Sequence, residues 1–194
     1  MRTTASPQEQ EEAILAAATE EFGRVGVRRS NLNAVARRAN VSRSTLYRRF
    51  PTKEELLYAV VGRLTESIFA ELQHHTTGMT AKQLVVEVFC IAVRETTSNP
   101  VLHQLMVAEP DTLAALLGFF GPGMSAVLDR AVELAVAQAI NAGAKMPPAD
   151  LRIVVELMIR LTTSLMNSPS AILDADDPAA ARQFAQKFFA PMIW

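Results

Sequence analysis

The chain has 194 residues, 49% of them hydrophobic and 20% charged, and its net charge is −1. A nearly neutral chain does not coat nucleic acid over its whole surface, so any nucleic-acid contact must be local. The single cysteine, Cys90, excludes an intramolecular disulfide framework and a multi-cysteine zinc site. The polar start of the chain and the lack of an apolar run of about 18 residues predict a cytoplasmic protein with no membrane segment.

Hydrophobic spacing predicts an all-α fold, because apolar residues recur at three and four positions along most of the chain. Charge separates two parts. Residues 1–63 hold eleven Lys and Arg against seven Asp and Glu, a balance of +4, and the remainder balances at −5. Between Arg24 and Lys53 there is no acidic residue. We expect a basic domain over residues 1–52 and an acidic helical domain over residues 53–194.

The basic domain contains the signals of three helices. The first is expected over residues 8–25, with Gly26 as its left-handed stop. A short second helix follows, with Asn31 as its N-cap. The turn after it contains Asn40, one of the few non-glycine residues that tolerate a left-handed conformation. Ser42 can then cap a third helix, so two short helices are joined by a tight turn.

The third helix presents polar side chains opposite its buried centre. With Leu46 buried, Ser44 and Arg48 lie on the opposite side, and Thr45 and Tyr47 lie on the flanks. Two short helices joined by a turn, the second with a small polar and cationic outer face, are the geometry of a helix-turn-helix. Hydroxyl groups bond phosphate oxygens and Arg contacts guanine, so this pattern predicts DNA binding.

The stretch from Ile14 to Leu57 resembles the DNA-binding domain of the TetR (tetracycline-repressor-like) regulators. The matching segments are ILAAA from Ile14 with Phe22 and Gly26, VARRANVS from Val35, and STLYRRFPTKEELL from Ser44. Three positions depart from the family pattern. Asn31 stands where threonine is usual, Asn40 where glycine is usual, and Val27 where an aromatic is common. Asparagine suits the first two positions because it caps helices and tolerates positive φ.

The resemblance implies an N-terminal three-helix DNA-binding domain followed by a helical ligand-binding and dimerisation domain. It also implies the residues that contact double-stranded DNA. Groove and phosphate contacts are expected from Arg43, Ser44, Thr45, Tyr47 and Arg48. Clamps on the DNA backbone are expected from Asn31 and Lys53, at the starts of the second and fourth helices.

Enzyme signatures are lacking in the sequence. We find no Gly-rich phosphate loop, no serine-nucleophile elbow and no zinc-protease motif, and the three histidines lack companions at metal-ligand spacing. We therefore expect no catalytic residues, no metal site and no cofactor. Cys90 lies on an apolar helix face and is interpreted as a structural thiol.

The acidic domain is expected to contain helices near residues 53–74, 80–98, 100–108, 111–142 with an interruption at residues 121–123, 149–167 and 178–190. Its middle helices carry soft and aromatic residues that could line a cavity for a small, mostly apolar effector. The candidates are Phe89, Cys90, Met106, Phe119, Phe120 and Met124, with Arg94 and His103 as polar anchors. Such residues could equally form plain core.

The helix over residues 149–167 is apolar on more than one face and must be covered on both. Together with the helix over residues 178–190 it is predicted to form a four-helix interface in a homodimer, as the resemblance also implies. Burial within one subunit is the alternative. The predicted function is a ligand-responsive repressor that binds a palindromic operator. The alternative is a helical small-molecule carrier whose basic face is incidental.

Overall fold

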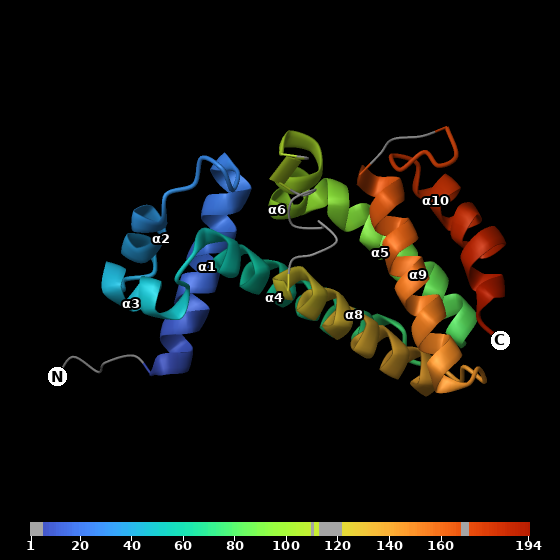
Figure 1. Ribbon diagram of the computed structural model, residues 1–194. Coiled ribbons are helices and arrows are strands. Elements are labelled where there is room, and N and C mark those ends of the chain that lie inside the picture. Colours follow the sequence, from blue (N-terminus) through green and yellow to red (C-terminus); the bar gives the residue numbers. More distant parts are fainter. Residues whose placement is uncertain (1–5, 110, 113–121, 168–170) are drawn as a thin grey trace. The chain divides into compact units, whose positions relative to one another are not determined.

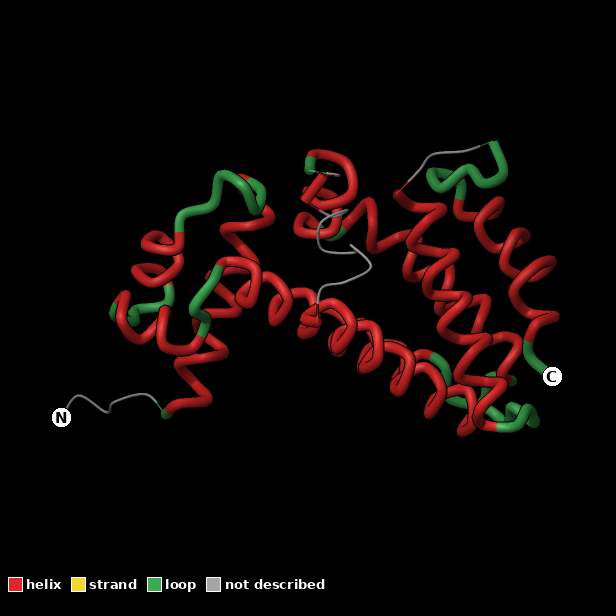
Figure 2. The backbone as a smooth tube through the Cα atoms, in the orientation of Figure 1, coloured by secondary structure: helices red, strands yellow, loops and turns green. Residues whose placement is uncertain are grey.

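The computed structural model describes residues 6–109, 111–112, 122–167 and 171–194 (Figure 1). Over these residues all regular elements are helices, which confirms the predicted fold class (Figure 2). Two compact units form, the first from Met1–Arg63 and Asn99–Met124 and the second from Leu64–Ser98 and Ser125–Trp194. The expected domain boundary after residue 52 therefore falls inside the first unit. None of the described helices is long and apolar enough to cross a membrane.

The first unit is built mainly from the N-terminal helices. Its elements are α1 (Pro7–Val25), α2 (Leu32–Arg38), α3 (Arg43–Arg49), the first part of α4 (Lys53–His75), α6 (Pro100–His103) and the π-helical turn η1 (Gln104–Ala108).

The second unit continues α4 and adds longer helices. These are α5 (Ala81–Ser98), most of α8 (Pro122–Asn141), α9 (Pro148–Asn167) and α10 (Pro178–Phe184), which is extended by the π-helical turn η2 (Ala185–Phe189) and the 3₁₀ turn η3 (Ala190–Met192). Periodicity alone predicted single α-helices over 100–108 and 178–190, so the changes to π geometry are a correction. Residues 113–121 of the expected helix at 111–142 lie outside the described residues.

Side-chain caps start the helices of the first unit. The side-chain oxygens of Asn31, Ser42 and Thr52 accept from backbone N–H groups two or three residues later, at 2.9, 3.0 and 3.1 Å. These caps confirm the predicted starts of α2, α3 and α4. The start of α1 has a reciprocal capping box between Ser6 and Glu9, which the sequence analysis missed and which moves the helix start to Pro7.

Two residues of the first unit have positive φ, as predicted. Asn40 has φ +54° in the turn between α2 and α3, and Gly26 has φ +81° after α1. With ψ 164°, Gly26 occupies a region that is essentially restricted to glycine. A Cβ at Gly26 would also overlap Oε1 of Glu109. Conformation and space therefore both require glycine at the start of the α1–α2 connection.

A shared apolar core orients the short helices of the first unit. Ile14 and Phe22 of α1, Val35 of α2 and Leu46 of α3 are fully buried. Helices of seven residues are not stable alone, so the packing of Val35 and Leu46 fixes how α2 and α3 lie. With Leu46 inward, the opposite side of α3 faces solvent.

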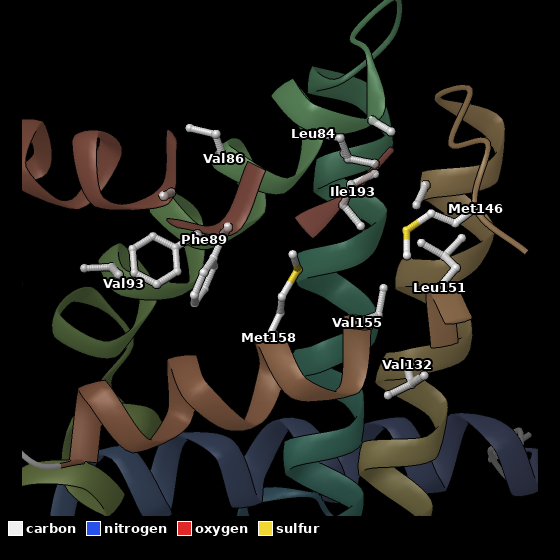
Figure 3. Close-up of a cluster of buried hydrophobic side chains, with 14 of the residues drawn as sticks. Leu84, Val86, Phe89, Val93, Val132, Met146, Leu151, Val155, Met158 and Ile193 are labelled. Carbon is white, nitrogen blue, oxygen red and sulfur yellow. The ribbon is translucent and has the colours of Figure 1, made fainter. Parts of the chain in front are cut away.

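The second unit has its own core, formed where α5, α9 and the C-terminal elements pack together (Figure 3). The Phe89 ring of α5 lies edge-on to Phe189, at a centroid distance of 5.0 Å, and stacks on Phe184 at 5.7 Å. At its edge the guanidinium of Arg182 donates to both carboxylate oxygens of Glu87, which ties α10 to α5 and lowers the pKa of that carboxyl. The aromatic cluster and this ion pair fix the C-terminal segment on the second unit.

Replacing Gly26 by alanine should lower the free energy of unfolding. The positive φ alone costs about 1–3 kcal/mol for a residue with a Cβ, and displacement of Glu109 adds to it because that carboxylate is hydrogen-bonded in place. Urea unfolding followed by circular dichroism measures the change. Gly143→Ala is the matched control, since Gly143 has φ +84° but a Cβ added there would meet no atom within 4 Å. Equal losses in the two variants would contradict the proposed clash.

Candidate nucleic-acid interface and ligand cavity

The predicted DNA-contacting residues of α3 share one solvent-exposed face. Arg43, Ser44 and Arg48 are exposed, Thr45 is half-buried, and 45% of Tyr47 is accessible. The buried Leu46 lies on the opposite side of the helix. The structure therefore brings together two guanidinium groups, a phenol and two hydroxyls on one helix face. These groups can donate hydrogen bonds to phosphate oxygens and base edges.

Hydroxyl groups gather at the start of α3. Ser42 Oγ lies 2.8 Å from Ser44 Oγ and 2.8 Å from Thr45 Oγ1, and it also accepts from the Thr45 N–H. The cap therefore positions three neighbouring hydroxyls beside the exposed face. A hydroxyl can rotate to donate or accept, so this group is suited to phosphate contacts.

Acidic residues of α1 neutralise several arginines of the first unit. Arg49 Nη1 lies 3.0 Å from Glu11 and Arg63 Nη1 lies 2.9 Å from Glu12. Arg38 pairs with Glu20 in the same manner.

The remaining basic charge is concentrated on fewer side chains. Arg37, Arg43 and Arg48 form no ion pair with any residue that the structure describes. The stretch from Arg24 to Lys53 holds no acidic residue of its own, but carboxylates of α1 pair with some of its arginines. Among the described residues, arginines without a carboxylate partner therefore lie on α3, on the outer side of α2 and, as Arg28 and Arg29, in the α1–α2 connection.

Lys53 holds the connection between α1 and α2. Its ammonium donates to the carbonyl oxygens of Val27, Arg28 and Ser30 at 3.0, 3.2 and 2.9 Å. An ammonium has three N–H donors, so all of them are directed at this connection. The structure thus gives Lys53 a positioning role that the sequence analysis missed, and its contact with the DNA backbone stays a prediction. Asn31, the other expected clamp, caps α2 and is exposed.

Glu109 holds the same connection from another element. It follows η1, is only 8% exposed, and accepts the Arg28 N–H with both carboxylate oxygens at 3.1 Å. Thr112 Oγ1 donates to the same carboxylate at 3.2 Å. The α1–α2 connection is therefore fixed by a cation from α4 and an anion that follows η1. No local sequence pattern signals this long-range contact.

Glu21 joins α1 to the start of α2. This buried carboxylate lies 2.8 Å from Arg24 Nη2. The hydrogen bond from Arg24 lowers the pKa of Glu21, burial opposes that effect, and a hydrogen bond from the Asn31 backbone lowers the pKa further. Because the ionised form is the one that is bonded, the folded unit favours a deprotonated Glu21.

The second unit contains a partly open, mostly apolar cavity of about 240 Å³. Its walls come from α4, α5, α8 and α9, with Phe189 at one side. Leu84, Phe89 and Met158, which Figure 3 labels, are among the lining residues. The polar side chains in the lining are those of Thr65, Gln138, Thr162 and Thr163.

Of the cavity residues predicted from sequence, the structure places Phe89 in the lining. Cys90 is half-buried on α5 outside the lining, and burial raises the pKa of its thiol. Arg94 is exposed and lies 3.5 Å from Glu95, so it is not an anchor in this cavity. Met106 and His103 belong to the first unit and are not among the lining residues. Phe119, Phe120 and the Met124 side chain lie outside what the structure describes.

Residues 14–60 match the family profile of the "Bacterial regulatory proteins, tetR family". This match covers α1, the helix-turn-helix of α2 and α3, and the start of α4, which are the elements that carry the exposed cationic face. Residues 14–60 thus form a TetR-family DNA-binding domain.

Several solved structures, TetR-family proteins among them, share the fold along nearly the whole chain. The repressor AlkX from Dietzia sp. strain DQ12-45-1b, implicated in biodegradation of n-alkanes, is 20% identical with a TM-score of 0.74, over 96% of this chain and 94% of that chain. A TetR regulator from Rhodococcus sp. RHA1 is 22% identical with a TM-score of 0.63, over 93% and 92%. RolR in complex with resorcinol is 18% identical with a TM-score of 0.64, over 93% and 94%. At these identities the likeness concerns the fold.

Acid should destabilise the wild-type chain more steeply than its Glu21→Gln variant. A carboxyl whose folded pKa is lowered contributes stability above its ordinary value of 4.5, and this contribution is lost as the pH falls through the folded pKa. Urea unfolding between pH 7 and pH 3 measures the difference. Glu54→Gln, which removes an exposed carboxyl of the same unit, is the control. Parallel curves for wild type and Glu21→Gln would contradict the assignment.

Proposed function

We propose that this TetR-family protein is a ligand-responsive repressor that binds a palindromic operator as a homodimer. The observation that supports operator binding is the α3 face, where Arg43 and Arg48 have no carboxylate partner among the described residues and lie beside exposed hydroxyls. In a helix-turn-helix the second helix enters the major groove, with its first residues toward the base edges. A DNA-binding regulator acts beside the chromosome, so we place its action in the cytoplasm.

An exposed apolar stripe supports the homodimer. Ile153, Leu157 and Leu161 recur every four residues on α9, each about half exposed, and Phe188 of η2 is equally accessible. The opposite face of α9, which includes Val155 and Met158, is buried in the core of the unit. Large apolar side chains that are exposed in helical register mark an interaction surface. We assign this surface to the four-helix interface of two copies.

The small residues of the C-terminal helix pack within their own unit. Ala181 and Ala185 are fully buried against the core of their own unit. They therefore allow α10 and η2 to approach α5 closely, and they leave Phe188 facing outward. In the proposed dimer the contact with the partner copy would come from Phe188 and the α9 stripe.

The apolar cavity supports a small organic effector. TetR-family relatives of the same fold include RolR, solved with resorcinol, and AlkX, implicated in n-alkane biodegradation. In our proposal the effector shifts α4, which lines the cavity with Phe69 and Leu72 and holds the α1–α2 connection through Lys53. Such coupling typically changes affinity by about 1–3 kcal/mol. A carrier without DNA binding would use the cavity alone and would not need the unpaired charge on α3.

Truncating Arg48 should weaken operator binding at least about fivefold, because a bidentate base contact contributes about 1–3 kcal/mol of discrimination. The DNA is a double-stranded sequence selected by the purified protein from a random library, and fluorescence anisotropy at several salt concentrations gives the affinity. Arg63→Ala is the charge-matched control, since Arg63 is already paired with Glu12. An equal loss in both variants would mean that only net charge matters, and the α3 assignment would fail.

The Leu157→Asp variant should be monomeric at micromolar concentration. The side chain is 46% exposed in a single copy, so the substitution disturbs the core little, whereas a carboxylate in an apolar interface remains unpaired. Sedimentation equilibrium measures the molecular mass. Ile140→Asp on α8 is the control, because Ile140 is 48% exposed and lies outside the α9 stripe. A stable Leu157→Asp dimer would contradict this interface.

A further inference from the structure

We infer that the cavity of the second unit is built for a neutral, mostly apolar molecule with one hydroxyl group, which donates its hydrogen bond to Oε1 of Gln138. This assignment names the chemical class of the effector and therefore rests on the proposed function for its regulatory meaning. The reasons are the state of the Gln138 side chain, the charge of the lining and the size of the cavity.

Gln138 lines the cavity and is buried, with a relative exposure of 6%. Its Nε2 donates to the backbone carbonyl oxygen of Phe69 at 2.9 Å. A carbonyl only accepts, so this bond fixes the orientation of the amide, with Nε2 toward Phe69 and Oε1 on the other side. The side chain cannot turn its oxygen to Phe69 without losing the bond.

Oε1 of Gln138 has no hydrogen-bond partner among the residues that the structure describes. A buried acceptor without a donor is unfavourable, and native structures satisfy such groups with protein, water or ligand. The hydroxyl of Thr163, which also lines the cavity, donates its hydrogen to the carbonyl oxygen of Ile159 at 2.9 Å. The unsatisfied acceptor therefore selects a ligand that supplies a donor.

The described lining contains no Asp, Glu, Lys, Arg or His. A carboxylate or ammonium would lose its hydration without gaining a counter-charge, which is strongly unfavourable. The remaining surface is aliphatic and aromatic, and it rewards an apolar body. A cavity of about 150 Å³ with apolar walls accommodates benzene, so the larger volume here suits a substituted ring or a medium-length chain.

The test compares matched probes by isothermal titration calorimetry on the 194-residue protein. 4-Ethylphenol carries the hydroxyl, ethylbenzene lacks it, and 4-ethylbenzoate replaces it with a carboxylate. 1-Octanol tests the same hydroxyl on a chain. We expect at least one hydroxylated probe, 4-ethylphenol or 1-octanol, to bind. If 4-ethylphenol binds, ethylbenzene should bind at least about tenfold more weakly; if 1-octanol binds, octane is the corresponding probe without a donor. The carboxylate probe 4-ethylbenzoate should not bind.

Substitution of Gln138 identifies the acceptor. In Gln138→Leu the preference for the hydroxylated probe over its hydrocarbon should fall to about onefold, because the buried amide acceptor that no protein group satisfies has been removed. Thr163→Val is the control and should keep the preference, since its hydroxyl is used within α9. If Gln138→Leu does not fold, the probe series on the wild type decides alone.

Three results would overturn the assignment: neither hydroxylated probe binds, the hydrocarbon or carboxylate binds as well as the hydroxylated probe, or Gln138→Leu keeps the preference. A separate titration on the protein bound to its selected DNA distinguishes this inference from the proposed function. If a hydroxylated probe binds through Gln138 but leaves DNA affinity unchanged, the ligand class stands and ligand-responsive regulation fails. If it binds and releases DNA, both stand.

Discussion

The burial of Leu46 is the constraint on which the proposed DNA-binding surface depends. A helix of seven residues has too few internal hydrogen bonds to persist alone, so α3 takes its orientation from the one side chain that it buries completely. With Leu46 inward, Arg43, Ser44 and Arg48 must face outward. The caps at Ser42 and Asn31 and the positive φ of Asn40 set the turn that brings α2 and α3 together. The helix caps, the turn at Asn40 and the burial of Leu46 together hold the polar face of α3 toward solvent.

Electrostatics then divides the basic residues into two groups. Arg38, Arg49 and Arg63 pair with acids of α1 and hold the helices of the first unit together. Arg43 and Arg48 have no such partner among the described residues and remain available to an external anion. The connection between α1 and α2 is held from two further elements, by the Lys53 ammonium on its carbonyls and the Glu109 carboxylate on an N–H. A shift of either element would therefore act directly on this connection.

Sequence reasoning predicted what depends on neighbours in the chain. The caps at Asn31, Ser42 and Thr52, the positive φ of Asn40 and Gly26, and the outward face of α3 follow from residue type and spacing. It missed what depends on tertiary packing. Neither the role of Glu109, 81 residues from its partner Arg28, nor the cavity lining could be read from periodicity, because the same spacing serves core and cavity alike. The sequence pattern identified Phe89 as an aromatic residue that could line a cavity. It did not identify Gln138, because the importance of Gln138 lies in a side-chain acceptor that has no donor in the folded structure.

The most direct test of the central claim, that the outer face of α3 lies against the bases of duplex DNA, is site-specific photocrosslinking. A photoreactive phenylalanine analogue replaces Tyr47 in one sample and the half-buried Tyr58 of α4 in another, each bound to the selected DNA. The account predicts crosslinks from position 47 to two sites about one helical turn apart, related by the symmetry of the DNA, and none from position 58. Crosslinks of equal yield from both positions, or none from position 47 on DNA that the protein binds tightly, would contradict it.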